Sequence, residues 1–242
     1  MGVYLFRRIH LRNVLSNLIA YKSRWLIEAS YKLTLQEQRF MLCCVAKVNP
    51  QSDMPKSITI HSDEFYGQFP DMGKENSERE LKKAVDRLWE RSIIVKDPSQ
   101  TDEFRWIHKR VRYHKGEGRV TVSFSEDIAK YLTQLSGQFA KVTLNNISGL
   151  KSVYSIRIYE LLQQFIKAGN RLITVEDFRF LLDLGDAYPQ FKSLNRALIQ
   201  PSLKEINLKS NLKVIVQQVK KGRSIHALHF IFKERDQMEF NV

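Results

Sequence analysis

The chain has 242 residues, and its 43% hydrophobic content is enough to form folded cores, which excludes a low-complexity chain. It carries 39 Lys and Arg against 26 Asp and Glu, a net charge of +13, split as +7 in residues 1–124 (22 − 15) and +6 in residues 125–242 (17 − 11). This spread excludes a single basic tail as the source. It favours polyanionic partners, first nucleic acid and then an anionic membrane, while a basic protein without a nucleic-acid role stays open.

The segment 1–22 is expected to be a leader that packs on the first folded unit. Arginines and an asparagine between positions 7 and 13 interrupt its apolar stretches, so neither a signal peptide nor a membrane span is predicted. An amphipathic helix lying on a membrane surface stays open. The adjacent Cys43 and Cys44 occupy an apolar helical run, which is typical of reduced thiols in a cytoplasmic protein.

The first unit is predicted over residues 23–124. A capping box at Thr34 and Glu37 opens a helix to about Val48, and Ser77 with Glu80 indicates a second capping box. The expected elements are helix 34–48, strand 58–60, helix 62–69, helix 77–91, strand 93–95, and a hairpin of strands 104–114 and 119–124 joined at Lys115-Gly116-Glu117-Gly118.

A connector is predicted over residues 125–150, with a helix from Ser125 to about Leu135, a strand at 139–144 and a loop at 145–149. The second unit follows over 151–235, and residues 236–242 form a tail. Its expected elements are helix 152–168, strand 172–173, a helix capped by Thr174 and Asp177 that ends at Gly185, helix 189–208, and strands 212–219 and 225–232.

The two units repeat one motif. Residues 57–65 and 171–178 each read as a short apolar strand that runs into an acidic helix start and then a core-facing Phe. In each half a longer helix precedes this element, and a second helix and a hairpin follow it. Helix, strand, helix, helix and hairpin is the order of a winged helix, a helix-turn-helix variant that reads DNA. The sequence therefore predicts an α+β chain with two tandem winged-helix domains.

The helix 189–208 is the strongest candidate for base recognition. At 100° per residue, Lys192, Arg196 and Gln200 form one stripe, with Lys204 beside it and Asn195 at its margin. Such donors can reach guanine and adenine edges in the major groove, although a solvated amphipathic helix has the same appearance. The opposing, core-facing side is expected to contain Leu194, Ala197, Leu198 and Leu208. Pro201 is expected to kink or restart this helix.

The basic hairpin tip formed by Lys220, Lys221 and Arg223 is expected to lie against phosphates, where point charges add affinity without sequence preference. An ordinary polar turn is the alternative. In the first unit the analogous cations are Arg79, Lys82 and Lys83. Acidic neighbours weaken their field, so this helix is expected to contribute less.

The hairpin 105–124 alternates Trp106, His108, Arg110 and Arg112 with Ile107, Lys109, Val111 and Tyr113. Its mixed aromatic and basic face predicts either a phosphate contact or an edge that pairs with a second copy of the chain, since exposed strand edges favour such pairing.

Catalytic motifs are missing from the sequence. There is no Walker loop, no GxSxG and no HExxH, and no two of the six histidines flank a single residue as a rolling-circle nickase requires. His226 and His229 point to opposite faces of a strand, so they do not form a metal pair. We expect no enzyme activity, no metal and no cofactor.

Three segments resemble the Rep_3 family of plasmid replication initiators. They are LIEASYKLTLQEQR at 26–39, SIRIYELL at 155–162, and LKEIN at 203–207 followed by the Lys-Lys-Gly-Arg turn. No single segment is diagnostic, but their order and spacing agree over about residues 23–235. Residues 1–22 match nothing in this resemblance.

The resemblance implies two winged-helix domains that bind repeated origin sequences, called iterons, in double-stranded DNA. It places the reader stripe on Lys192, Asn195, Arg196 and Gln200. It also implies origin opening by monomers, autorepression by homodimers that pair through the first domain, and recruitment of a host initiator and the replicative helicase. The edge of hairpin 105–124 is the expected place of that pairing. The alternatives left open are a winged-helix transcription regulator, an origin nickase or primase, and a scaffold that binds protein.

Overall fold

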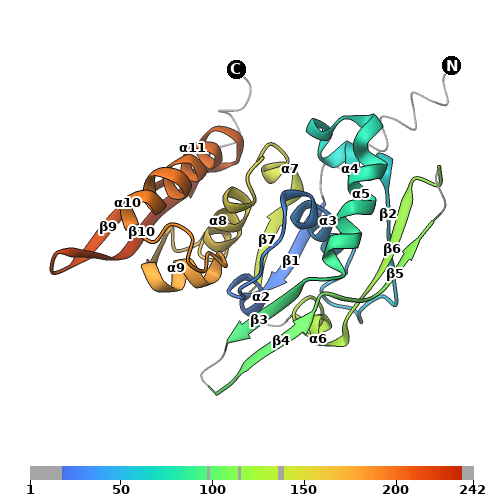
Figure 1. Cartoon of the computed structure of the whole chain (residues 1–242), viewed down its shortest axis with the longest axis horizontal. Coiled ribbons are helices and arrows are strands. Elements are labelled where there is room, and N and C mark those ends of the chain that lie inside the picture. The colour runs from blue at the N-terminus through green and yellow to red at the C-terminus, as the bar shows by residue number, and fades with distance from the viewer. Residues whose placement is uncertain (1–17, 97–98, 114–115, 136–138, 236–242) are drawn as a thin grey trace.

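A computed structural model describes residues 18–96, 99–113, 116–135 and 139–235 of the chain. The expected leader residues 1–17, Lys115 of the expected turn and the expected tail 236–242 lie outside the described residues. Figure 1 shows the two halves side by side along the longest axis, with the first half to the right and the second to the left. None of the described helices combines the length and the apolar character that crossing a membrane requires.

The first half has the predicted order of helix, strand, helix, helix and hairpin. Its elements are α3 (Leu35–Val45), β2 (Ile58–His61), α4 (Ser62–Gln68), the 3-10 turn η1 (Pro70–Met72), α5 (Lys74–Leu88), β5 (Ile107–Arg112) and β6 (Arg119–Phe124). The three strands form one antiparallel sheet in the order β2-β6-β5. The capping box predicted at Thr34 and Glu37 is confirmed, because each side chain bonds the backbone amide of the other residue.

Two local predictions in this half are wrong. Helix α5 begins at Lys74, three residues before the expected capping box, and the Ser77 hydroxyl donates to the Lys74 carbonyl from inside the helix. The expected strand 104–114 is divided at Trp106 into β4 (Thr101–Arg105) and β5. Trp106 is fully buried and meets the Tyr31 ring edge-on with centroids 5.0 Å apart, so core packing turns the chain there.

Two small sheets flank this winged helix. β3 (Ser92–Lys96) pairs with β4, and β1 (Ile19–Ser23), which leads into α2 (Arg24–Ile27), pairs with β7 (Phe139–Thr143). Only the single turn α6 (Glu126–Ala129) forms where a helix to Leu135 was expected, and α7 (Leu144–Ile147) begins the expected loop. The predicted leader 1–22 and connector 125–150 therefore meet in one sheet, and their limits stay a prediction.

The second half repeats the winged-helix order. Its elements are α8 (Val153–Gln163), β8 (Asn170–Thr174), α9 (Val175–Leu181), α10 (Phe191–Leu194), the π-helical turn η2 (Asn195–Ile199), α11 (Gln200–Lys209), β9 (Leu212–Lys221) and β10 (Ser224–Glu234). The strands form an antiparallel sheet in the order β8-β10-β9. The predicted Thr174 cap is confirmed, since its hydroxyl accepts from the Asp177 amide at 3.0 Å.

Pro201 explains the π-helical turn within α10–α11. Proline has no amide hydrogen, and its ring crowds the carbonyl four residues earlier, so a regular α-helix cannot continue through it. The Gln200 amide instead bonds the Asn195 carbonyl, five residues back. The chain thus passes Pro201 as one helical rod from Phe191 to Lys209. The sequence predicted a kink or a restart at Pro201, and the structure instead has a π-helical turn just before it.

One apolar core continues from the first half into the second and runs from Ala20 to Phe232. Helix α8 lies between the halves in Figure 1 and contacts β7 on one side and α11 on the other. Cys43 and Cys44 are buried free thiols, as expected, and burial raises the pKa of both thiols. The two winged helices therefore share one core and are not independent domains joined by a linker.

Candidate nucleic-acid interface

The rod α10–α11 presents most of the predicted reader residues to solvent. Lys192, Arg196, Gln200 and Lys204 are exposed, and Asn195 is half-buried. Leu194 and Leu198 face the core as predicted. The prediction is wrong for Ala197, which is exposed, and for Leu208, whose exposed fraction is 66%. Both errors follow from the π-helical turn, which rotates the later residues away from the straight-helix pattern.

The same turn changes which side chains are neighbours. In an α-helix Gln200 would lie over Arg196, four residues earlier. Here the Gln200 Nε2 amide donates to Asn195 Oδ1 at 3.1 Å, so Gln200 lies over Asn195 instead. The stripe therefore consists of two cations, Lys192 and Arg196, beside an interacting pair of amides. Amide groups of this kind can bond adenine edges, and guanidinium groups can bond guanine edges.

The hairpin β9–β10 projects beyond the rest of the second half (Figure 1). Its turn is at Gly222, where φ is +62°, a conformation that favours glycine. Lys220, Lys221 and Arg223 are all exposed at this tip. The basic hairpin expected from the sequence is therefore a protruding element that follows the rod.

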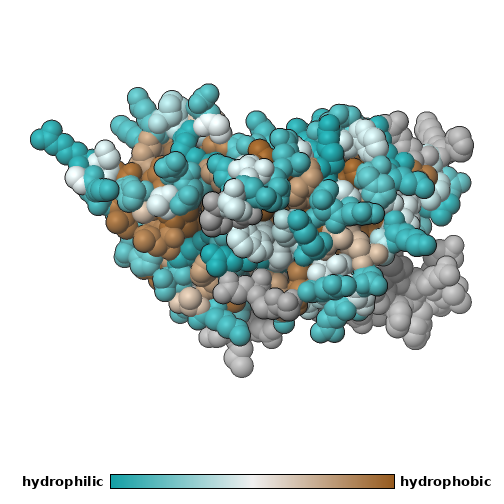
Figure 2. Space-filling model, turned by 90° about the horizontal axis from the view of Figure 1, so that it is seen from below, coloured by the Kyte–Doolittle hydropathy of each residue, from teal (hydrophilic) through white to brown (hydrophobic). Residues whose placement is uncertain are grey.

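The outer face of the sheet β8-β10-β9 carries three exposed apolar side chains. Leu172, Ile215 and Val219 share this face by strand register, and they are 62%, 60% and 38% exposed. Figure 2 shows apolar surface gathered on the side of the molecule that carries the hairpin.

The six predicted DNA-binding cations of the second half have no acidic partners in the described chain. Within the described chain none of Lys192, Arg196, Lys204, Lys220, Lys221 and Arg223 forms an ion pair. Their full charge is available to a polyanion that approaches the rod and the hairpin tip. Exposed, unpaired Lys and Arg side chains are the groups that neutralise DNA phosphates and release counterions.

Helix α5 in the first half differs sharply, because each of its three predicted cations is paired within the helix. Arg79 lies 3.3 Å and Lys83 lies 3.4 Å from Glu80, and Lys82 lies 2.6 Å from Glu78. The Lys82 ammonium and the Gly116 amide lower the pKa of the Glu78 carboxyl. The hydrogen bond from the Gly116 amide to Glu78 also connects the helix to the hairpin tip. These ion pairs explain why acidic neighbours weaken the positive field of the α5 cations, as the sequence predicted.

The hairpin 105–124 is less exposed than its aromatic alternation indicated. Trp106 is buried, and His108 Nδ1 lies 2.8 Å from the Phe124 carbonyl oxygen. The Arg110 guanidinium stacks 4.9 Å from the Trp89 ring and lies 3.4 Å from Asp86, so it packs on α5. Strand β5 is nevertheless at the edge of its sheet, where backbone groups are available for pairing.

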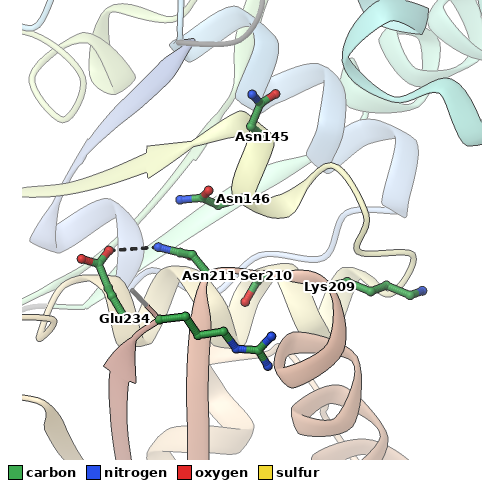
Figure 3. Close-up of a pocket in the computed structure, with 7 residues that line it drawn as sticks. Asn145, Asn146, Lys209, Ser210, Asn211 and Glu234 are labelled. Atoms are coloured by element: carbon green, nitrogen blue, oxygen red, sulfur yellow. Dashed lines mark hydrogen bonds between the residues drawn. The ribbon is translucent and has the colours of Figure 1, made fainter. Parts of the chain in front are cut away.

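A polar pocket of about 410 Å³ lies where the C-terminal end of α11 meets α7 and the end of β10 (Figure 3). It is lined by Asn145, Asn146, Lys209, Ser210, Asn211, Glu234 and Arg235. Asn211 donates to Glu234 at 2.9 Å and accepts from the Tyr159 hydroxyl at 2.8 Å. These bonds link α8 to the ends of β9 and β10 within the second half, and Asn145 and Asn146 of α7 complete the lining of the pocket.

Two stretches of the chain match known protein families in sequence. Residues 19–163 match "Initiator Replication protein, WH1", and residues 174–232 match "Initiator Rep protein, WH2". The chain belongs to this family of initiator replication proteins. The predicted family, the two winged-helix domains and the replication-initiator function are confirmed by these matches.

Curated relatives and solved structures agree with this assignment. The initiator is 32% identical to a "Replication initiation protein" of Escherichia coli, over 93% of this chain and 72% of that protein. It is 26% identical to an "Uncharacterized 27.6 kDa protein" of Escherichia coli, over 79% of this chain and 85% of that protein. Its fold is similar to that of the Pi initiator protein, solved in complex with iteron DNA, with a TM-score of 0.79, 19% identity and coverage of 92% and 99%.

Sequence reasoning missed one set of residues in the initiator. Lys22, Arg157 and Glu160 form a buried charged cluster between the halves, with side-chain exposures of 1%, 3% and 0%. The available signal was an Arg and a Glu three positions apart in the otherwise apolar run SIRIYELL. One helical turn separates two such residues, which predicts that they meet on one face.

Proposed function

We propose that this initiator binds iterons at a plasmid origin in double-stranded DNA, with the second winged helix as the main base reader. The supporting observation is the charge contrast between the two reader helices. The rod residues Lys192, Arg196 and Lys204 and the three cations of the β9–β10 tip form no ion pair in the described chain, whereas Arg79, Lys82 and Lys83 of α5 are paired within their helix. The fold shared with a protein solved on iteron DNA supports the same proposal.

Each group of side chains has a distinct role in this proposal. Lys192, Asn195, Arg196 and Gln200 approach base edges in the major groove, where bidentate contacts discriminate between base pairs. Lys204 and the hairpin residues Lys220, Lys221 and Arg223 contact phosphates, which fix register and add affinity. The α5 residues Arg79, Lys82 and Lys83 make auxiliary phosphate contacts, because their ion pairs are exposed and cost little to break.

Selection from a random duplex library tests sequence-specific binding directly. The full chain should enrich a defined motif, and footprints on that motif should protect two adjacent major grooves, one for each winged helix. Recovery of random duplexes alone would contradict base reading. Protection of a single groove would contradict contact by the first winged helix.

We propose that dimers form through the edge strand β5 of hairpin 105–124. Sedimentation over a range of concentrations should show a monomer–dimer equilibrium. Hydrogen exchange should show backbone protection of residues 107–112 that grows with the dimer fraction, because edge pairing satisfies free amides. Dimerisation without added backbone protection in β5 would show that the dimer interface lies in another part of the chain.

We further propose that the initiator acts in the bacterial cytoplasm without catalysis, by opening the origin and recruiting the host initiator and the replicative helicase. Incubation with supercoiled origin DNA and Mg²⁺ tests the non-enzymatic part. The topology should stay supercoiled, and permanganate should detect locally unpaired bases at the origin. Any nicked product would contradict the non-catalytic mechanism and would indicate strand cleavage by the protein.

A further inference from the structure

Helix α8 carries a buried charged cluster that holds the two winged helices against each other. The Glu160 carboxylate binds the Lys22 ammonium of β1 at 2.6 Å and the Gln38 amide of α3 at 3.1 Å. Burial would raise the pKa of this carboxyl, but Lys22 and Arg157 together hold the pKa below its ordinary value. The cluster is therefore charged, enclosed and built from both sides of the joint.

Arg157 is the member of this cluster that reaches both halves. Its Nη2 donates to the carbonyls of Ile27 and Ala29 in the first half, at 3.1 and 3.0 Å. The same nitrogen donates to the Leu181 carbonyl of α9 in the second half, at 3.1 Å. Its Nη1 donates to Glu160 at 2.9 Å. A planar guanidinium with several donors fixes these backbone segments in one geometry.

A second arginine extends this geometry from α9 to the start of the reader helix. Arg179 donates to the carbonyls of Gly185, Ala187 and Tyr188, at 2.6, 2.7 and 2.9 Å. These residues immediately precede α10, which begins at Phe191. The line of hydrogen bonds therefore runs from α8 through α9 to the base of the proposed base reader.

A cluster of this kind defines orientation more than it adds stability. Moving charges out of water is costly, and a well-packed apolar joint of similar volume could hold two domains equally well. Hydrogen bonds, unlike apolar contacts, require particular distances and angles. The joint thus specifies one arrangement of α5 relative to α10–α11.

We propose that Arg157 is a positioning residue that sets the separation and rotation between the two DNA-contacting helices, and so the spacing of base pairs that the initiator accepts. The inference rests on the proposed function, because it requires both winged helices to contact DNA. Arg157 itself touches no DNA in this proposal, since its side chain is enclosed in the joint.

The first test uses Arg157→Met, which removes the guanidinium and leaves Lys22 paired with Glu160. Arg157→Lys keeps the charge and serves where the Met variant does not fold. Val122→Ala is the matched control, because it removes buried methyl groups from β6, away from the joint. Circular dichroism establishes that each variant is folded.

Each protein is titrated with its selected site and with the same site carrying one base pair inserted between the two protected grooves. The insertion moves one groove by about 3.4 Å and rotates it by about 35°. Wild type should lose about tenfold to hundredfold in affinity on the inserted site. The ratio of the affinity for the selected site to the affinity for the inserted site should fall by at least about threefold in Arg157→Met. It should stay unchanged in Val122→Ala. An unchanged ratio in the folded Arg157 variants overturns the proposal.

A second test is independent of DNA. Spin labels at Glu75→Cys on α5 and Leu208→Cys on α11 report the distance between the helices, and the native cysteines are buried from the label. The distance distribution should be narrow in wild type and in Val122→Ala, and broad in Arg157→Met. An equally narrow distribution in Arg157→Met overturns positioning. A broad distribution together with a one-groove footprint would instead contradict the two-helix contact of the proposed function.

Discussion

The two winged helices share an order of elements but differ in how their reader helices treat charge. Glutamates of α5 pair with Arg79, Lys82 and Lys83 on the same helix, whereas Lys192, Arg196 and Lys204 of the rod and the three cations of the hairpin tip form no ion pair in the described chain. The net charges of the two halves are nearly equal, so composition does not reveal this difference. In the proposed function, local ion pairing and not total charge makes the first helix the weaker DNA contact.

The largest expected effect comes from the joint that both units share. Glu160→Leu leaves Lys22 and Arg157 buried without their carboxylate, and the free energy of unfolding should fall by about 3–5 kcal/mol. Urea unfolding monitored by circular dichroism measures the change. The double variant Lys22→Met with Glu160→Leu should recover part of the loss, because it removes one unpaired charge. No recovery would mean that the two residues act independently.

The same carboxylate predicts a dependence on pH. Its pKa is lowered in the folded state by Lys22 and Arg157, so its contribution to stability is complete above the unfolded carboxyl pKa of about 4.3. The contribution is lost as the pH falls through the lower, folded-state pKa. Urea unfolding between about pH 6 and pH 3 should therefore show a steeper acid loss for wild type than for the double variant. Parallel curves would exclude Glu160 as a source of the acid sensitivity.

A substitution in each reader helix tests the contrast directly. Arg196→Ala should cost about 1–3 kcal/mol of binding free energy on the selected site and much less on random duplex, because a base contact is lost. Arg79→Ala on α5 is the matched control and should cost less than about 1 kcal/mol on either DNA. Fluorescence anisotropy gives both values. Equal losses for Arg196→Ala on the two duplexes would reduce this residue to a phosphate contact.

The hairpin tip should contribute to binding only through electrostatic contacts with phosphates, whose strength depends on the salt concentration. Lys221→Ala should weaken binding to all duplexes alike and reduce the slope of log affinity against log salt by about one. Lys82→Ala, which removes a cation already paired with Glu78, should change the slope by less. Anisotropy titrations at four salt concentrations provide the comparison. An unchanged slope for Lys221→Ala removes the hairpin tip from the interface.

The smallest expected effect comes from a substitution that leaves cations of α5 unpaired, as they are on the rod α10–α11. Glu80→Gln releases Arg79 and Lys83 from their shared carboxylate, so affinity for random duplex should rise by a few tenths of a kcal/mol. The effect should disappear at high salt, where exposed charges are screened. Weaker or unchanged binding at low salt would show that α5 lies away from DNA.

Sequence patterns predicted the elements that local chemistry specifies. The Thr34 and Thr174 caps, the short strands and the basic hairpin at Gly222 each depend on residues that are close in the chain. The predictions failed where distant packing decides the outcome. Trp106 ends a strand because it enters the core beside Tyr31, and no periodicity within the strand records that contact.

The candidate site shows the same division. Exposure of Lys192 and Arg196 followed from helical spacing, but the pairing of Gln200 with Asn195 depends on how the chain accommodates Pro201. Proline chemistry predicted a kink or a restart at this point, and not the π-helical turn that the structure has. The charged joint was missed because Lys22 and Glu160 are 138 residues apart.

The contacts of the Arg157 joint depend on side-chain identity to different degrees. The family match for the first winged helix ends at residue 163, so α8 stays with the partners of its cluster, Lys22, Tyr31 and Gln38. Toward the second winged helix Arg157 binds the backbone carbonyl of Leu181, an acceptor that every residue type supplies. This contact therefore does not depend on which side chain stands at position 181, whereas the Arg171–Glu28 ion pair across the same joint does depend on its side chains.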